Sequence, residues 1–232
     1  MRRILLLDNS IANDSYRPLD YWQPLLLLPF DVFRAPFNEW PADMTAYSHI
    51  ILTGSTASVL QDTGWMRAEV EFIRRAAAAG KVILGSCFGH QLIARAFFGT
   101  HAVRTREKPE IGWPEIEILA NDPLLGEAGR SIYSYAFHYD EVRWVPAEQA
   151  TVIARSATCD IQGFKLNGRP VWGIQPHFEI GIVAGLAYLD LAAGDGVPAR
   201  THFLKSDRDF PKDSGWILPL MKAFQEVRPA ED

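Results

Sequence analysis

The sequence predicts an α/β protein built on a mostly parallel sheet. In the first part of the chain, short apolar runs alternate with amphipathic stretches of helical length, an order typical of βαβ units. In the later part, short apolar runs follow one another and are joined by turns. One of those turns is Asn167-Gly168, a strong signal for a β-hairpin. We therefore expect a parallel sheet that is extended by a hairpin.

The first part of the chain accounts for four strands and two helices. The expected strands are Ile4–Leu7, Asp31–Arg34, His49–Leu52 and Lys81–Leu84. A helix is expected over Trp65–Ala79, with Glu69 among its exposed residues and Gly80 as its C-cap. A second helix is expected over Phe88–Phe98. The remainder of the segment from Ile11 to Trp40, rich in Pro and aromatic residues, permits no assignment.

The later part of the chain is expected to be mainly β. The expected strands are Ile116–Leu119, Val142–Val145, Thr151–Ala154, Ile161–Leu166 and Val171–Ile174. The mixed charges from Arg104 to Lys108 are interpreted as a solvated loop, and helices are expected over Ile180–Ala193 and Gly215–Val227. Because there is no repeat, low-complexity segment or obvious linker, we expect one domain over residues 1–232.

Composition excludes several classes of protein. The net charge of −5 argues against a nucleic-acid binder and against a polybasic membrane anchor. Two cysteines are too few for a disulfide framework and favour a reduced, cytoplasmic location. The apolar run Ile4–Leu7 is too short for a signal peptide, and no stretch approaches the ~20 apolar residues of a membrane helix.

The clearest candidate for chemistry is Cys87, in the run Gly85-Ser86-Cys87-Phe88-Gly89-His90-Gln91. An expected strand leads into this run and a helix leaves it, which is the pattern of a nucleophile elbow with Cys in place of Ser. The helix start favours the thiolate, and the backbone N–H of Phe88 can point at an oxyanion. A lone cysteine is more often a small buried residue, but the flanking glycines favour a functional one.

A cysteine nucleophile needs a base that a third group orients, and His177 and Glu179 fit these roles. In an extended segment, residues two positions apart face the same side, so Glu179 can fix the tautomer of His177. The alternative is a buried histidine bonded to the backbone. His90 is interpreted as structural and Cys159 as an unreactive thiol.

Together, the Cys87 run and the segment His177-Phe178-Glu179 resemble the class I glutamine amidotransferases. More narrowly, the sequence is similar to stand-alone members that resemble the amidotransferase domain of GMP synthase, and to plant γ-glutamyl peptidases. The likeness extends from about Ile50 to Ile180 and also includes Leu52-Thr53-Gly54-Ser55, Trp65, Gly112-Trp113 and Phe137-His138-Tyr139-Asp140-Glu141-Val142.

This resemblance implies a flavodoxin-like three-layer sandwich and a Cys87-His177-Glu179 triad. It implies that Gly54 supplies a second oxyanion N–H beside that of Phe88. It also implies that Gln91 and the backbone around His138 and Tyr139 bind the glutamyl α-amino and carboxylate groups. The family usually has Pro between the His and the Glu, where this chain has Phe178.

The function that we expect is cysteine-dependent hydrolysis of a γ-glutamyl amide through a thioester. The ammonia or amine goes either to a separate ammonia-accepting synthetase or, in a free-standing hydrolase, to solvent. The alternatives are a redox-sensing or non-catalytic flavodoxin-like protein, or a degenerate amidotransferase that acts as a binding module. No cofactor is expected, and His138-Tyr139-Asp140 lacks a third ligand at a supporting spacing, so no metal is expected.

Overall fold

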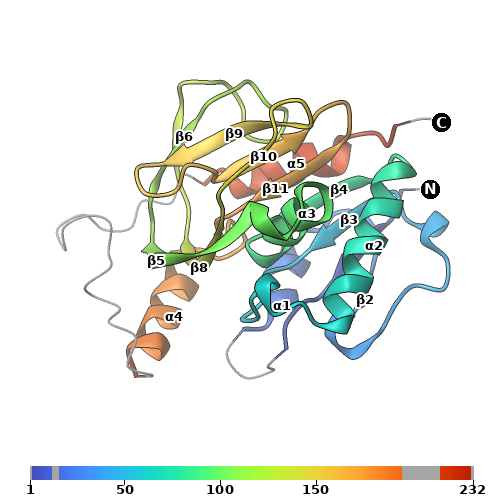
Figure 1. Ribbon diagram of the computed structural model, residues 1–232, viewed down its shortest axis with the longest axis horizontal. Coiled ribbons are helices and arrows are strands. Elements are labelled where there is room, and N and C mark those ends of the chain that lie inside the picture. The colour runs from blue at the N-terminus through green and yellow to red at the C-terminus, as the bar shows by residue number, and fades with distance from the viewer. Residues whose placement is uncertain (1, 12–15, 195–214, 231–232) are drawn as a thin grey trace.

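The computed structural model describes residues 2–11, 16–194 and 215–230. Its centre is a nine-stranded sheet with the order β2-β1-β3-β4-β11-β10-β9-β6-β7 (Figure 1). The parallel half comprises β1 (Ile4–Leu7), β2 (Phe30–Phe33), β3 (His49–Leu52), β4 (Val82–Ser86) and β11 (Val171–Ile174). The antiparallel half adds β10 (Gly163–Leu166), β9 (Ala150–Ser156), β6 (Glu115–Ile118) and β7 (Ser131–Tyr133).

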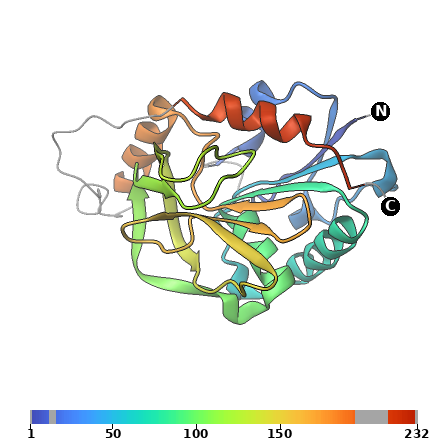
Figure 2. The same cartoon turned by 90° about the horizontal axis from the view of Figure 1, so that it is seen from above.

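Helices cover both faces of the parallel half. Helices α2 (Gly64–Ala78) and α3 (Phe88–Phe98) lie on one face, and α1 (Pro18–Trp22) and α5 (Ile217–Glu226) lie on the other (Figure 2). Alternate residues of β1 serve the two faces: Leu5 and Leu7 belong to the core under α2 and α3, whereas Ile4 and Leu6 belong to the core under α5. The expected three-layer α/β sandwich is confirmed.

A second, two-stranded antiparallel sheet joins β5 (Val103–Gly112) to β8 (Ala136–Val142). Helix α4 (Ile182–Gly194) lies at one end of this pair, outside the sandwich (Figures 1 and 2). Short 3-10 helices cover Gln23–Leu25, Ala35–Phe37, Met44–Ala46, Val59–Gln61 and Thr100–Ala102. None of the helices in the described ranges is both long and apolar enough to cross a bilayer.

The β5–β8 pair corrects two expectations. The charged run from Arg104 to Lys108 is not a loop but part of β5, because Arg104 and Arg106 both form ion pairs with the buried Glu141 of β8. The expected strand Val142–Val145 is also wrong. Val142 is the last residue of β8 that pairs with β5, opposite Val103, so that strand ends where the prediction had it begin.

The other expected elements are present, with ends that differ by at most two residues. The hairpin at Asn167-Gly168 is confirmed, since β10 and β11 pair antiparallel across it and Gly168 has a φ of 68°. The unassigned segment contains α1 as well as β2, and β7 is a strand that the sequence analysis missed. The extent of the domain, residues 1–232, stays a prediction.

Candidate active site

Cys87 lies at the sharp turn between β4 and α3, where it is the N-cap of the helix. Its φ of 49° and ψ of −103° are a strained conformation for a residue with a side chain. The turn requires glycine on both flanks: a Cβ on Gly85 would lie 2.5 Å from the carbonyl oxygen of Gly89, and a Cβ on Gly89 would lie 2.3 Å from that of Leu52. The turn therefore has the geometry of a nucleophile elbow.

The sheet brings His177 to this turn because β4 and β11 are parallel neighbours. Ile174, the last residue of β11, pairs with Ser86, so both chains leave the sheet at the same edge. His177 Nδ1 lies 2.7 Å from Glu179 Oε1, which leaves Nε2 for Cys87, whose negative charge also acts on the imidazole. The structure thus brings Cys87, His177 and Glu179 together, with His177 between the other two.

Phe178 lies between these two polar residues and points the other way. Its buried ring packs edge-on against Trp22 at a centroid distance of 5.3 Å, and it contacts Trp216 at 6.0 Å. The side chain that stands where the family usually has Pro therefore anchors this segment in the core under α5. The expected extended segment is wrong: Phe178 and Glu179 lie in a turn, closed by the Ile180 N–H donating to the His177 carbonyl at 3.1 Å, and this turn brings Glu179 Oε1 back to the imidazole.

The negative groups beside His177 favour the protonated form of its imidazole. Burial alone would lower the pKa of His177, but the negative charges of Cys87 and Glu179 outweigh it and raise that pKa to about 10. Glu179 itself accepts hydrogen bonds from the Tyr16 hydroxyl at 2.9 Å and from Ser86 Oγ at 3.1 Å. The sequence analysis predicted neither donor. Tyr16 lies in the unassigned segment, and Ser86 was noted only as a residue of the Cys87 run, without a role of its own.

Gly54 closes the site above His177. A Cβ at this position would lie 2.5 Å from His177 Cε1 and 3.1 Å from the Tyr16 hydroxyl, so only glycine fits without a shift of its neighbours. The N–H of Phe88 is the first of α3 and has no carbonyl one turn earlier in the helix to bond. The two expected oxyanion donors thus lie on the two chain segments that border Cys87 and His177.

Two buried polar residues, Asn9 and Glu69, lie next to Thr53, the residue before Gly54. The backbone N–H of Asn9 donates to Thr53 Oγ1 at 2.9 Å, and Asn9 Nδ2 donates to Glu69 Oε1 at 3.0 Å. The expectation that Glu69 is exposed is wrong: this carboxyl is fully buried between α2 and the ends of β1 and β3. Burial raises the pKa of Glu69 to about 8, so at neutral pH it is a carboxylic acid.

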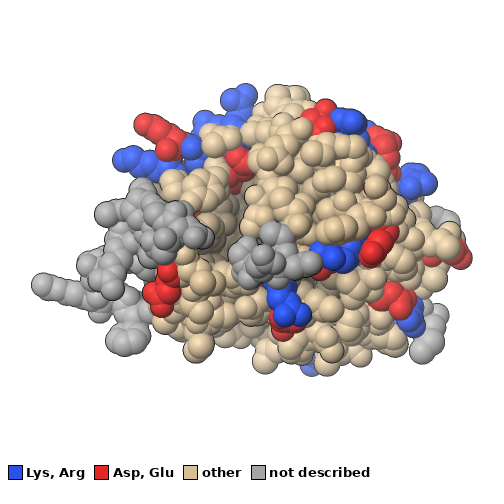
Figure 3. All heavy atoms as spheres, turned by 90° about the horizontal axis from the view of Figure 1, so that it is seen from below, with Lys and Arg blue, Asp and Glu red and all other residues tan. Residues whose placement is uncertain are grey.

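A cavity of about 550 Å³ opens beside Cys87. Five of the predicted site residues line it, namely Cys87, Gln91, His138, Tyr139 and His177. Most of the remaining wall is aromatic or aliphatic. Figure 3 shows that this face of the molecule is hollowed.

The predicted substrate-binding residues lie on the wall formed by α3 and β8. Gln91 Nε2 donates to the Asp140 carbonyl at 2.8 Å and to Gln175 Oε1 at 3.2 Å, which ties α3 to both neighbouring segments. Tyr139 is 45% exposed at the cavity wall, whereas the His138 side chain is buried. Their roles toward a substrate stay predictions.

A second cluster lies on the far side of β8, where the side chains of Glu110, His138 and Cys159 converge with their ligand-type atoms within 4.8 Å of one another. His138 Nε2 lies 2.8 Å from Glu110 Oε2, and its Nδ1 donates to the Asp140 carbonyl at 2.9 Å. Glu110 also accepts from three uncharged side chains, those of Ser156, Thr158 and Gln162. These bonds account for the convergence without a metal ion.

Burial raises the pKa of Cys159 far above its ordinary value, which supports its interpretation as an unreactive thiol. His90 is fully buried under α3 against Phe164, with its pKa lowered by burial to about 3, in keeping with a structural role.

A cysteine at a strained strand-to-helix turn, next to a histidine that a carboxylate orients, is the arrangement used by enzymes with cysteine nucleophiles. The family follows from the sequence match. Residues 28–184 fit the model of the family described as glutamine amidotransferase class-I, and the chain belongs to this family.

Curated relatives narrow the comparison. One of the subunits of a glutamine-hydrolysing GMP synthase from Methanothermobacter thermautotrophicus is 40% identical over 98 residues, which cover 42% of this chain and 51% of that protein. Gamma-glutamyl peptidase 4 of Arabidopsis thaliana is 32% identical over 144 residues, which cover 59% of this chain and 57% of that protein. The chain thus spans about half the length of the curated relatives that it matches.

Solved structures match over nearly the whole chain. A glutamine amidotransferase from Thermotoga maritima has a TM-score of 0.72 at 20% identity and covers 97% of this chain and 99% of its own. One from Methylobacillus flagellatus has a TM-score of 0.73 at 21% identity, covering 99% and 96% respectively. At these identities the likeness concerns the fold alone.

Proposed function

We propose that the protein hydrolyses a γ-glutamyl amide through a thioester on Cys87, with Cys87, His177 and Glu179 as its catalytic triad. The observation that carries the proposal is the strained elbow at Cys87 facing an imidazole that Glu179 holds at 2.7 Å. The family and the names of the relatives support the same chemistry. A redox-sensing or binding role would need no oriented base at this place.

In the first step, the Cys87 thiolate attacks the γ-carbonyl carbon and the carbonyl π-bond opens to a tetrahedral oxyanion. The N–H groups of Gly54 and Phe88 stabilise this oxyanion, each by roughly 3–4 kcal/mol in comparable sites. The imidazolium of His177 then gives the proton on Nε2 to the leaving nitrogen. The C–N bond breaks, ammonia or an amine departs, and a γ-glutamyl thioester remains on Cys87.

In the second step, neutral His177 takes a proton from water, and the resulting hydroxide attacks the thioester. The C–S bond breaks, the γ-carboxylic acid departs and gives its remaining proton to solvent, and the thiolate–imidazolium pair is restored. Glu179 keeps Nδ1 protonated throughout, so that Nε2 is the nitrogen that exchanges protons. No step requires a cofactor.

The cavity favours one version of this activity. Its volume of about 550 Å³ is within the roughly 300–1,000 Å³ that holds drug-sized ligands, more than free glutamine fills. Its partly aromatic wall suits an amine larger than ammonia. We therefore favour a γ-glutamyl peptide or conjugate as substrate over free glutamine, with Gln91 and the backbone near His138 and Tyr139 binding the glutamyl end. A glutaminase component that feeds a separate synthetase is the second version.

The chemistry is tested by reaction with a glutamine-mimicking electrophile, followed by mass spectrometry of the intact and digested protein. We expect one adduct, on Cys87. The adduct should vanish in Cys87→Ala, form slowly in His177→Ala and persist in the matched control Cys159→Ala. Labelling on Cys159, or none at all, would overturn the mechanism.

The two versions are separated by the purified protein on its own. A larger kcat/KM on γ-glutamyl peptides than on glutamine, with no added partner, is expected for the favoured version. Slow hydrolysis of glutamine alone, which rises when a synthetase is added, would instead identify a component that delivers ammonia.

A further inference from the structure

The carboxylate of Glu179 is held by three donors from three parts of the chain. Oε1 accepts from His177 Nδ1 at 2.7 Å and from the Tyr16 hydroxyl at 2.9 Å. Oε2 accepts from Ser86 Oγ at 3.1 Å. Tyr16 comes from the short segment before α1, far from the other two in the sequence. The Tyr16 hydroxyl and His177 Nδ1–H both donate to the same oxygen, Glu179 Oε1.

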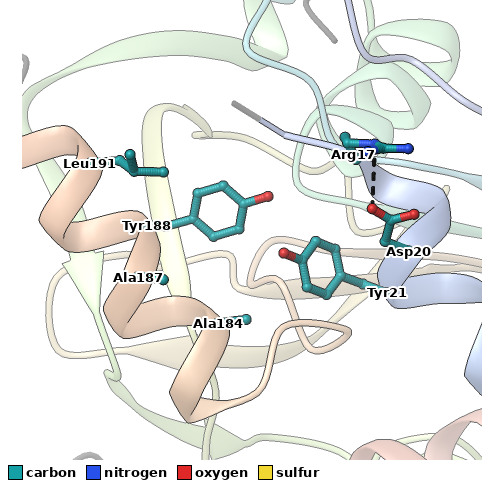
Figure 4. Close-up of a pocket in the computed structure, with 7 residues that line it drawn as sticks. All are labelled: Arg17, Asp20, Tyr21, Ala184, Ala187, Tyr188 and Leu191. Carbon is teal, nitrogen blue, oxygen red and sulfur yellow. Dashed lines mark ion pairs between the residues drawn. The ribbon is translucent and has the colours of Figure 1, made fainter. Parts of the chain in front are cut away.

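The Tyr16 ring is fixed on both sides. One side meets the His177 ring at a centroid distance of 5.5 Å and an angle of 75°, and the other meets Tyr188 of α4 at 6.2 Å. Tyr188 in turn faces Tyr21 of α1 across the pocket between the two helices, as Figure 4 shows, with their rings 6.1 Å apart. This row of rings directs the buried Tyr16 hydroxyl at Glu179.

We propose that Tyr16 is a positioning residue of this site, whose hydroxyl holds Glu179 in place and limits how strongly Glu179 retains the proton of His177. The inference rests on the proposed function. Two donors on one carboxylate oxygen share its negative charge, so each bond is weaker than it would be alone. The carboxylate of Glu179 is buried, and no bulk solvent screens this charge.

The consequence concerns the second step of the cycle. Once the thioester has formed, Cys87 carries no negative charge, and Glu179 becomes the main group that keeps His177 protonated. His177 must be neutral to take a proton from water. The titratable groups around His177 and Glu179 are Cys87, Tyr16, Tyr135 and Tyr188. Among them, Tyr16 donates to Glu179 directly.

The experiment is an NMR titration of the His177 ring in the Cys87→Ala protein, with and without Tyr16→Phe. Cys87→Ala mimics the loss of the thiolate charge, and the measurement needs no turnover. Removal of the hydroxyl should raise the pKa of His177 by about one unit, which is the order of one lost hydrogen bond to a charged group. With Cys87 present, Tyr16→Phe should lower kcat at neutral pH about tenfold.

Tyr47→Phe is the matched control, because the Tyr47 hydroxyl also donates to a carboxylate at 2.9 Å, that of Asp31, in a part of the chain remote from the cavity. It should leave the His177 titration and kcat unchanged. Ser86→Ala removes the donor on the other oxygen without touching the Tyr16 ring, so the pKa of His177 should rise again.

A His177 pKa that is unchanged or lowered in Tyr16→Phe, or lowered in Ser86→Ala, would overturn the inference. Failure of the proposed function looks different. In that case no γ-glutamyl amide is hydrolysed by the wild-type protein, while the shift in the NMR titration persists.

Discussion

The molecule contains two buried groups that each comprise a cysteine, a histidine and a glutamate. One joins Cys87, His177 and Glu179 at the end of the parallel strands. The other joins Cys159, His138 and Glu110 between the β5–β8 pair and the antiparallel half of the sheet. The His–Glu contacts are nearly equal, 2.7 Å in the first group and 2.8 Å in the second.

The difference lies in which nitrogen remains for the cysteine. His177 uses Nδ1 for its glutamate and keeps Nε2 for Cys87, whereas His138 uses Nε2 for its glutamate and Nδ1 for a backbone carbonyl. Cys87 also lies at a strained helix start beside a cavity, while Cys159 lies in a buried loop. Under the proposed function, the same three residue types therefore provide chemistry only where the fold leaves one imidazole nitrogen and one sulfur facing a substrate.

The largest expected difference is in the rate of hydrolysis after substitution of one or the other cysteine. Cys87→Ala should lower γ-glutamyl hydrolysis by about a thousandfold or more, because no nucleophile remains. Cys159→Ala should change it less than about threefold. Steady-state kinetics of the two variants decide the matter, and comparable losses from both would show that the groups are not as distinct as their geometry indicates.

The two histidines should differ in what they stabilise. His138→Ala leaves the buried carboxylate of Glu110 without the hydrogen bond from His138 Nε2 and should lower the free energy of unfolding by about 3 kcal/mol. His177→Ala should cost less than half of that, since its side chain is 9% exposed at the cavity against 1% for His138, and water can replace it. Urea denaturation of both variants measures the contrast, and equal costs would contradict it.

The group around Glu110 should also make the free energy of unfolding fall at acid pH. Burial alone would raise the pKa of Glu110, but hydrogen bonds from His138 and its other donors lower it from 4.5 to about 2. The unfolded chain therefore binds more protons between these values, so this stabilisation is present above about pH 4.5 and is lost as the pH falls toward 2.

We expect the stability difference between wild type and Glu110→Gln to shrink by about 3 kcal/mol across that window. Glu69→Gln is a control of opposite sign. The raised pKa of Glu69 makes the wild type lose stability, relative to this variant, as the pH rises from about 4.5 to about 8. Urea denaturation at several pH values tests both, and a constant difference for Glu110→Gln would contradict the lowered pKa of Glu110.

Much of the fold, and the placing of Cys87 and His177, could be predicted from the sequence because the deciding signals are local. A strand, a glycine-flanked turn and a helix follow one another at Cys87, and His177 follows a strand of the same sheet. The parallel register between those strands then brings the two side chains together without further information.

The features that could not be predicted depend on contacts between distant segments. Tyr16 and Glu179 lie 163 residues apart, and no pattern around Tyr16 indicates its partner. Glu69 occupies a polar position in its helix pattern and is buried only because Asn9 meets it. Likewise, Arg104 and Arg106 form a strand because Glu141 lies opposite them, a fact that their own charges do not reveal.

The smallest expected difference concerns two serines, each of which donates to the glutamate of one group. Ser156 Oγ donates to Glu110 Oε1 at 2.7 Å, and Ser86 Oγ donates to Glu179 Oε2 at 3.1 Å. Ser156→Ala should lower the free energy of unfolding by about 1–2 kcal/mol, because a buried carboxylate loses one of its donors, and should leave kcat within about twofold.

Ser86→Ala should carry a similar cost in stability, because the carboxylate of Glu179 is also buried, but should in addition lower kcat several-fold. The reason is that Glu179 retains its bonds to His177 and Tyr16 but can rotate, so the imidazole is less firmly oriented toward Cys87. Measurement of kcat and of the urea midpoint for both variants completes the comparison. The opposite result, with Ser156→Ala slowing hydrolysis and Ser86→Ala leaving kcat unchanged, would show that the group around Glu110 positions the catalytic machinery rather than the sheet.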